Sequence, residues 1–201
     1  GYKSAYQQPG ELFITAVPTE SKLGSNSGIS CCISSWTRIS DNSMPPRAKG
    51  ISNYQNSRLV STEAELNGYD AGIILNSQGK VSEGAYGCIF TIRSGIVYTP
   101  PITADILESI TRDTIITLLQ EELNIPVQVR DLDRTELYVS DEIFLCGTYA
   151  EIDPVISVDR YVIGTGNPGP ITGKLMELYK KLVYGESNLH PEWISLINIP
   201  D

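Results

Sequence analysis

Lys49 and Glu83 are the residues of this sequence whose type and setting could do chemistry. Lys49 lies in the segment Met44–Tyr54, and Glu83 lies in the segment Val81–Phe90. A semi-buried lysine beside another cation can lose its proton near neutral pH by desolvation, and its amine then becomes a nucleophile. Taken singly, each residue is better explained as a solvent-exposed charge. Their significance therefore depends on the segments around them.

The cysteines and the single histidine argue against metal and triad chemistry. Cys31 and Cys32 are adjacent, whereas Cys88 and Cys146 stand apart, so no pair has the CxxC spacing of zinc or thioredoxin motifs. A Ser-His-Asp triad would depend on His190. We expect instead a partly buried or surface histidine, no metal, and a reduced, intracellular protein.

The charge distribution excludes nucleic acid as a partner. The 201 residues carry 15 basic and 24 acidic side chains, a net charge of −9. Residues 1–100 contain 8 basic and 7 acidic side chains, and residues 101–201 contain 7 and 17. An acidic chain without a basic stripe lacks the surface that neutralises phosphates. No apolar run reaches the roughly 18–20 residues of a membrane span, so we expect a cytoplasmic protein without membrane contact.

Hydrophobic periodicity predicts a mixed sheet covered by helices. Short apolar runs rich in β-branched residues indicate strands, and turn residues at Ser77–Gly79 and Ser94–Gly95 indicate hairpins. The expected strands are Leu12–Val17, Ile29–Ile33, Ala71–Leu75, Cys88–Ile92, Ile96–Tyr98, Pro126–Val129 and Ile143–Cys146.

Helical spacing predicts three helices. They cover Thr103–Leu123, with Thr103 or Asp105 as N-cap, about Thr172–Tyr184, and Asn53–Leu66. The loop Gly164–Pro170 leads into the second of these helices. It could bind an anion at the helix N-terminus, but such a loop more often only turns the chain.

Taken together, several segments resemble the branched-chain aminotransferases, which are fold-type IV enzymes that use pyridoxal phosphate. The resemblance extends from Ser34–Arg38 to about Trp193 and includes the Lys49 and Glu83 segments. It implies an α/β (α+β) fold, a mixed-sheet pseudo-barrel domain covered by helices. Residues 1–201 would then be the cofactor-binding large C-terminal domain, with the small N-terminal domain absent and the active site incomplete.

The resemblance implies a cofactor role for several residues. Lys49 would form the Schiff base with pyridoxal 5′-phosphate, Tyr54 would donate a hydrogen bond to the phenolic oxygen, and Glu83 would pair with the pyridine nitrogen. In Leu107–Arg112, Leu107 would pack on the ring, and Ile110 and Thr111 would bind the phosphate. Asp133–Tyr138 and Gly169–Thr172 also resemble family segments and are expected to be scaffold.

The segment Gly147–Ile152 is expected to complete the site. Thr148 would add a hydroxyl to the phosphate, and Thr148, Tyr149 and Ala150 would contact the substrate, with backbone amides around Tyr149 and Ala150 taking its α-carboxylate. Trp36 and Tyr149 would line the side-chain pocket.

Two residues beside Glu83 depart from the family pattern. Relatives usually carry asparagine where Cys88 stands and often glutamate where Gly87 stands. The polar network next to Glu83 is therefore expected to differ.

The implied reaction is exchange of an amino group between a branched-chain L-amino acid and 2-oxoglutarate, with Lys49 moving the proton, in a homodimer or larger homo-oligomer. D-amino acid aminotransferases and aminodeoxychorismate lyases share the lysine and the glutamate and remain alternatives. A non-catalytic scaffold that keeps the fold is a further alternative. A sugar- or nucleotide-binding domain is weaker, since no P-loop is present.

Overall fold

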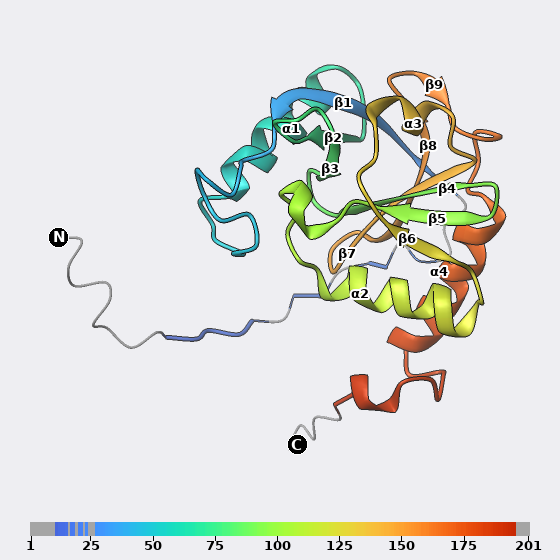
Figure 1. The fold of residues 1–201 in the computed structure, drawn as a ribbon. Coiled ribbons are helices and arrows are strands. Elements are labelled where there is room, and N and C mark those ends of the chain that lie inside the picture. Colours follow the sequence, from blue (N-terminus) through green and yellow to red (C-terminus); the bar gives the residue numbers. More distant parts are fainter. Residues whose placement is uncertain (1–10, 16, 19, 22, 24–26, 196–201) are drawn as a thin grey trace.

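Runs of strands are interleaved with helices along the chain (Figure 1). The structure is a computed structural model that describes residues 11–15, 17–18, 20–21, 23 and 27–195. Its elements are β1 (Ile29–Thr37), α1 (Tyr54–Leu66), β2 (Ala71–Leu75), β3 (Val81–Gly84), β4 (Cys88–Arg93), β5 (Ile96–Thr99), a 3₁₀ turn (Ile102–Ala104), α2 (Ile110–Thr117), a π-helical turn (Leu118–Glu122), β6 (Val127–Val129), α3 (Arg134–Tyr138), β7 (Glu142–Gly147), β8 (Glu151–Val158), β9 (Tyr161–Val162), α4 (Pro170–Val183) and a 3₁₀ turn (Pro191–Trp193).

All the strands join one curled, mixed sheet. Their order is β3-β2-β1-β8-β7-β4-β5-β6, and β9 pairs with β8. β1 is parallel to β2 and β8, and β5 is parallel to β6, whereas the other pairs are antiparallel. The predicted mixed-sheet half-barrel with helices is confirmed.

The central strands bury side chains on both faces. Along β4, Phe90 packs into a cluster with residues of α2 and α4, while its neighbour Ile89 points into a second cluster on the other face. β7 alternates in the same way with Phe144, whose ring stacks on that of Phe90 at 4.9 Å. On the opposite arm of the sheet, α1 packs on β1 and β2. The sheet thus positions α1 and α2 at two sides of one region.

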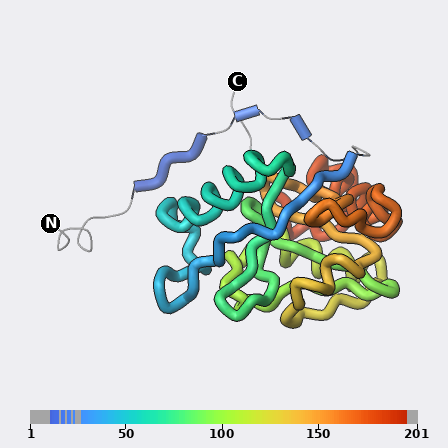
Figure 2. Tube along the Cα trace, turned by 90° about the horizontal axis from the view of Figure 1, so that it is seen from above, coloured from blue at the N-terminus to red at the C-terminus, as the bar shows by residue number. Residues whose placement is uncertain are grey.

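The expected strand Leu12–Val17 is wrong. Residues 11–15 lie in no strand of the described chain, and Leu12, Phe13, Ile14 and Val17 are 80–85% exposed; Ala16 lies outside the described residues. Figure 2 shows residues 11–15 running clear of the body. The alternation of apolar residues was a local signal, and no neighbouring strand supplies the hydrogen bonds that would complete it.

The expected helix Thr103–Leu123 is wrong at its N-terminal end, where the observed helix begins later. Asp105 adopts a left-handed conformation with φ of 63°, which interrupts the helix after one 3₁₀ turn. α2 starts at Ile110, after Ser109 as N-cap, whose hydroxyl accepts a hydrogen bond from the Arg112 N–H. The residues between, which include Leu107, form an extended segment.

The remaining expectations differ mainly at element ends. The other six strands, the two hairpins and the helices α1 and α4 are confirmed to within a few residues, while β3, β8 and β9 were missed. β8 was hidden because Pro154 interrupts its pattern. That proline pairs with Phe144 on the β7 side, just before the pairing of β8 with β1 begins at Val155. No helix of the described residues is long and apolar enough to cross a membrane.

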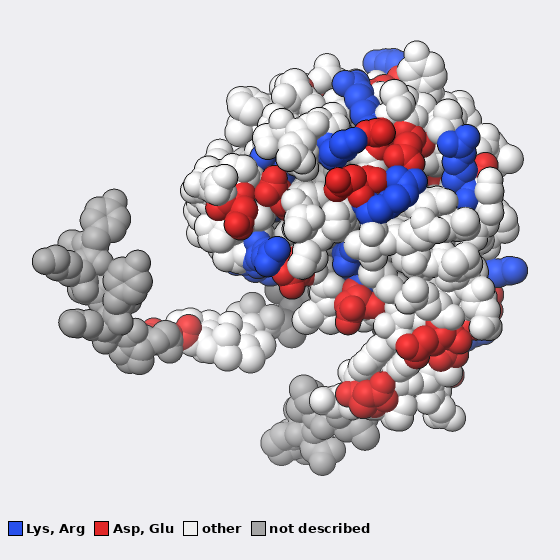
Figure 3. All heavy atoms as spheres, viewed as in Figure 1, with Lys and Arg blue, Asp and Glu red and all other residues white. Residues whose placement is uncertain are grey.

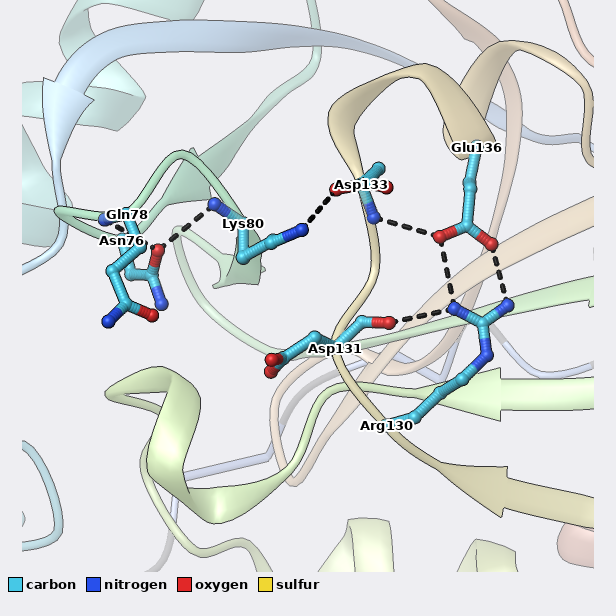
Figure 4. Close-up of polar contacts among 7 residues, drawn as sticks. All are labelled: Asn76, Gln78, Lys80, Arg130, Asp131, Asp133 and Glu136. Carbon is cyan, nitrogen blue, oxygen red and sulfur yellow. Dashed lines mark hydrogen bonds and ion pairs between the residues drawn. The ribbon is translucent and has the colours of Figure 1, made fainter.

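A polar network ties the β2–β3 turn to α3 (Figure 4). The Lys80 ammonium lies 2.5 Å from Asp133 Oδ1, and Arg130 donates two hydrogen bonds to the Glu136 carboxylate. Asp133 and Glu136 form a capping box at the start of α3. On the face of the molecule that carries α3, Lys and Arg side chains lie against Asp and Glu side chains (Figure 3). The predicted scaffold segment Asp133–Tyr138 is thus held in place by ion pairs of its two acidic side chains with Lys80 and Arg130.

Candidate active site

One cavity of about 870 Å³ opens between the loop before α1, the end of β3, the segment before α2 and the turn after β7. Seven of the predicted site residues line it: Lys49, Tyr54, Glu83, Leu107, Ile110, Thr148 and Tyr149. Residues far apart in the sequence therefore meet in one place, as the resemblance implies.

Lys49 stands in a loop that is fixed by an asparagine. The side-chain amide of Asn53 donates to the carbonyl oxygens of Pro45 and Ala48, at 2.9 Å each. The Lys49 side chain is exposed at the cavity, and its amine has no hydrogen bond or ion pair among the described residues. The expected partial burial of this lysine is therefore not observed. Tyr54, the first residue of α1, is also exposed.

Glu83 is the buried acid of the cavity. Its Oε1 lies 2.8 Å from the Arg38 guanidinium, and its Oε2 accepts a hydrogen bond of 3.1 Å from the Leu107 N–H. Burial raises the pKa of the Glu83 carboxyl to about 7, and Arg38 and the Leu107 N–H oppose that rise. Arg38 is itself buried, and its Nε donates to the carbonyl oxygen of Asp105. The left-handed Asp105 thus presents that oxygen to the arginine.

The N-terminus of α2 opens on the cavity. Ser109 and Ile110 line the cavity, and the N–H groups of Ile110 and Thr111 make no hydrogen bond among the described residues. Two such N–H groups at a helix start are a site for an anion. The Thr111 side chain is buried and contributes to the surroundings of Tyr179, outside the cavity lining.

The N-terminus of α4 is already filled by an anion of the chain itself. The carboxylate of buried Glu142 accepts hydrogen bonds from the Ile171 and Thr172 N–H groups, at 3.0 and 2.8 Å. Gly169 makes room for it, because a Cβ there would lie 2.1 Å from Glu142 Cδ. The loop Gly164–Pro170 therefore turns the chain, as the simpler expectation had it.

Three residues that were expected to contact the substrate lie in three different places. Tyr149 lines the cavity with its ring edge-on to Tyr86 at 6.5 Å. Ala150 is fully buried and does not line the cavity. Trp36 lines a separate groove of about 440 Å³ against α1. Its strand end is fixed there by Glu63 of α1, which accepts hydrogen bonds from the Ser35 N–H.

The residues that depart from the family pattern pack closely against β7. A Cβ on Gly87 would lie 2.6 Å from the carbonyl oxygen of Cys146, so only glycine fits this backbone approach. The Cys88 thiol donates a weak hydrogen bond to the Leu107 carbonyl oxygen at 3.6 Å, and burial raises its pKa to about 12. A neutral thiol therefore stands next to Glu83, at the position where relatives usually carry asparagine.

Sequence reasoning missed Arg38, Arg47 and Glu108 as lining residues. Arg38 and Arg47 stand in segments that the resemblance had singled out, and Glu108 follows Leu107 directly. Their basic or acidic character beside predicted cofactor residues was the signal that could have found them. It was lost because surface charges in other parts of the chain look the same in a sequence.

Comparison with known proteins agrees with this geometry. Residues 2–158 match the family model described as amino-transferase class IV. A probable branched-chain-amino-acid aminotransferase of Aquifex aeolicus is 46% identical over 173 residues, which are 86% of this chain and 56% of that protein. The branched-chain-amino-acid aminotransferase of Escherichia coli K12 is 40% identical over 191 residues, or 94% of this chain and 62% of that protein.

Solved structures show the same fold. The branched-chain amino acid aminotransferase of Thermobaculum terrenum, solved in its PLP form, has a TM-score of 0.87 and 49% identity, over 89% of this chain and 58% of that one. The chain thus spans somewhat more than half the length of the relatives it matches. Since the family model covers more than half of its residues, this chain belongs to the class IV aminotransferase family.

Proposed function

We propose that this chain forms the cofactor-binding part of a pyridoxal phosphate-dependent enzyme that moves amino groups between branched-chain L-amino acids and 2-oxoglutarate. The observation that carries the proposal is that one cavity brings together a buried carboxylate with an amine and a helix N-terminus that have no partner among the described residues. The names of the relatives and the PLP form of the Thermobaculum terrenum structure support the cofactor and the substrate class.

The residues of the cavity fit the cofactor's chemical groups. An aldehyde needs an amine, which Lys49 offers without a competing ion pair among the described residues. A protonated ring nitrogen needs a carboxylate, which Glu83 offers from a buried position. A phosphate needs N–H donors, which α2 leaves free at Ile110 and Thr111. Each requirement has a separate partner in the chain.

Pyridoxal phosphate, when bound, supplies an electron sink for the negative charge that forms at the substrate Cα. Lys49 Nζ would hold the cofactor through its aldehyde carbon and would then carry the proton from the substrate Cα to that carbon. Because Lys49 is exposed in this chain, other groups that close over the cavity must lower the solvation of its amine.

Arg38 acts on the reaction through Glu83. The guanidinium lowers the pKa of the Glu83 carboxyl against the rise that burial causes, and so favours the carboxylate form. Arg38 and the Leu107 N–H fix both carboxylate oxygens and so aim the acid at the ring nitrogen. Leu107, which lines the cavity, packs against the ring face in this proposal.

We assign substrate contacts to the turn after β7. Thr148 and Tyr149 border the cavity and would meet the substrate α-carboxylate, with the Ala150 N–H as a further donor. Trp36 lies in its own groove and would reach substrate only through a partner or a further part of the enzyme. We also propose that residues 1–201 form the large domain of the enzyme and that it works as a homo-oligomer in the cytoplasm, where the four free cysteines stay reduced.

Borohydride reduction tests the proposal. The protein is incubated with pyridoxal phosphate, reduced, digested and mapped by mass spectrometry. We expect the phosphopyridoxyl group on Lys49, no adduct at this position in Lys49→Ala, and an unchanged Lys49 adduct in the control Lys80→Ala, whose ammonium is held by Asp133. A folded protein without the Lys49 adduct would refute the proposal and favour a scaffold that keeps the fold.

A further inference from the structure

Arg47 is the cation of the cavity that the proposed reaction does not use. The basic side chains among the described lining residues are Arg38, Arg47 and Lys49. Arg38 is engaged with Glu83, and Lys49 is needed as an amine. Arg47 Nε has one ion-pair contact, 3.4 Å from Glu108 Oε1, with both side chains about half exposed.

This ion pair places Arg47 beside the N-terminus of α2. Glu108 directly precedes Ser109, the N-cap, and Ser109 and Ile110 line the same cavity. A guanidinium that touches the Glu108 carboxylate therefore borders the segment that leads directly into the N-terminus of α2. The pair also connects the Lys49 loop to the segment before α2.

The charges of the cavity favour a cation at this place. Four lining side chains are acidic, namely Glu20, Glu83, Glu108 and Glu151, and three are basic. A phosphate at the start of α2 would carry a charge of about −1.5 to −2 next to Glu108. Helix N–H groups supply partial charges only, so repulsion by Glu108 would oppose binding unless a full positive charge screens it.

The Arg47–Glu108 pair can give way to a stronger partner. A half-exposed ion pair with a single contact contributes little to stability, because water screens it. A phosphate offers guanidinium several oxygens and bidentate geometry. Exchange from carboxylate to phosphate is therefore favourable for Arg47.

We propose that Arg47 binds the phosphate of the cofactor together with the N-terminus of α2, and that Glu108 weakens this binding by holding Arg47 and repelling the anion. The inference rests on the proposed function, which supplies the phosphate ligand. It adds a binding residue and an opposing acidic residue to that site.

Comparison of pyridoxal phosphate with pyridoxal, which lacks the phosphate, isolates this contact. Dissociation constants of both are measured by equilibrium titration of the cofactor absorbance with the wild type and the Arg47→Ala variant. We expect Arg47→Ala to raise the dissociation constant of pyridoxal phosphate by about tenfold and to change that of pyridoxal by less than twofold. The control Arg58→Ala removes the same charge from α1, beside the other groove, and should change neither.

Glu108→Gln gives an effect of opposite sign. It frees Arg47 and removes the repulsion, so pyridoxal phosphate should bind about threefold more tightly, again without a change for pyridoxal. If the ion pair only fastened the two loops together, Glu108→Gln would weaken binding just as Arg47→Ala does. Equal losses for the two ligands in Arg47→Ala, or no loss, would also overturn the proposal.

The wild type separates this inference from the proposed function. If wild-type protein binds neither ligand at Lys49, the proposed function fails and the phosphate role falls with it. If the wild type binds both ligands and Arg47→Ala behaves as the wild type, only the role of Arg47 is refuted.

Discussion

The helices α2 and α4 both pack on β7, but their N-termini are satisfied in different ways. At α4, Glu142 of β7 itself supplies the anion, and its carboxylate binds two N–H groups in a buried setting. At α2, the corresponding N–H groups face a cavity, with Ser109 capping only the Arg112 N–H. The N–H groups of Ile171 and Thr172 at the start of α4 have an acceptor within the chain, whereas those of Ile110 and Thr111 at the start of α2 have none among the described residues.

The same difference separates two lysines. Lys80 is held by Asp133, and this contact raises its pKa, whereas Lys49 has no partner among the described residues. A charge that the chain satisfies internally serves the fold. A charge or donor that is left open at a cavity is available for chemistry, so function is found by asking which groups remain without a partner.

Exchange of the two lysines for alanine should give the largest contrast. Lys49→Ala removes the amine that moves the proton, and we expect amino-group transfer to fall by about 10³-fold or more. Lys80→Ala should change the rate by less than twofold. Steady-state rates of the assembled enzyme with L-leucine measure both, and equal losses would mean that the lysines act through stability alone.

Removal of the Glu142 carboxylate should destabilise the start of α4. Glu142→Ala leaves two buried N–H groups without their charged acceptor, and we expect a loss of about 4 kcal/mol in the free energy of unfolding. Denaturant titration measures it. The control Glu177→Ala, on the exposed face of α4, should stay within about 0.5 kcal/mol. A loss below about 1 kcal/mol for Glu142→Ala would show that water replaces the carboxylate.

The buried Glu83 carboxyl in the cavity predicts that the stability of the protein depends on pH. Burial raises the pKa of Glu83 from 4.5 to about 7, so the folded state holds this proton more tightly than the unfolded chain. The contribution of Glu83 to stability is therefore complete below about pH 4.5 and is lost as pH rises toward 7, a total of about 3 kcal/mol.

Glu83→Gln should remove that part of the pH dependence. Unfolding free energies of the ligand-free protein at several pH values between 4.5 and 8 test this. If the wild type instead gains stability relative to Glu83→Gln over this range, Arg38 outweighs burial and the direction is wrong.

Inorganic phosphate should bind at the start of α2 and not at that of α4, and its effect is the smallest of those expected here. At ten times its dissociation constant, it should stabilise the protein by about 1.4 kcal/mol. Hydrogen exchange should slow at the Ile110 and Thr111 amides and stay unchanged at Ile171 and Thr172. Equal slowing at both helix starts would indicate a general salt effect rather than binding at α2.

Much of the fold could be predicted because its signals are local. Ala71–Leu75 is predicted with its true bounds, and Ser94–Gly95 forms the expected hairpin turn, with positive φ at both residues. Leu12–Val17 has an equally good strand pattern, but residues 11–15 lie in no strand of the described chain. Pairing partners are a property of the tertiary structure, and a single run of residues does not contain them.

The candidate site divides in the same way. Lys49, Glu83 and Ile110 are found at the cavity, where the resemblance places them. Trp36 lies in another groove, because Glu63 holds the end of β1 against α1. The pairing of Arg38 with Glu83 depends on the left-handed backbone of Asp105, which the sequence does not reveal.

The close contact between Gly169 and Glu142 restricts which substitutions this protein can accept during evolution. Any larger side chain at Gly169 would occupy the space of the Glu142 carboxylate, so the two positions cannot change independently. A shorter acid at position 142 has to come first and free the space, and only then can alanine follow at position 169. The reverse order passes through a chain whose α4 has lost its anion. The order of mutations, and not only their identity, therefore decides which descendants of this sequence still fold.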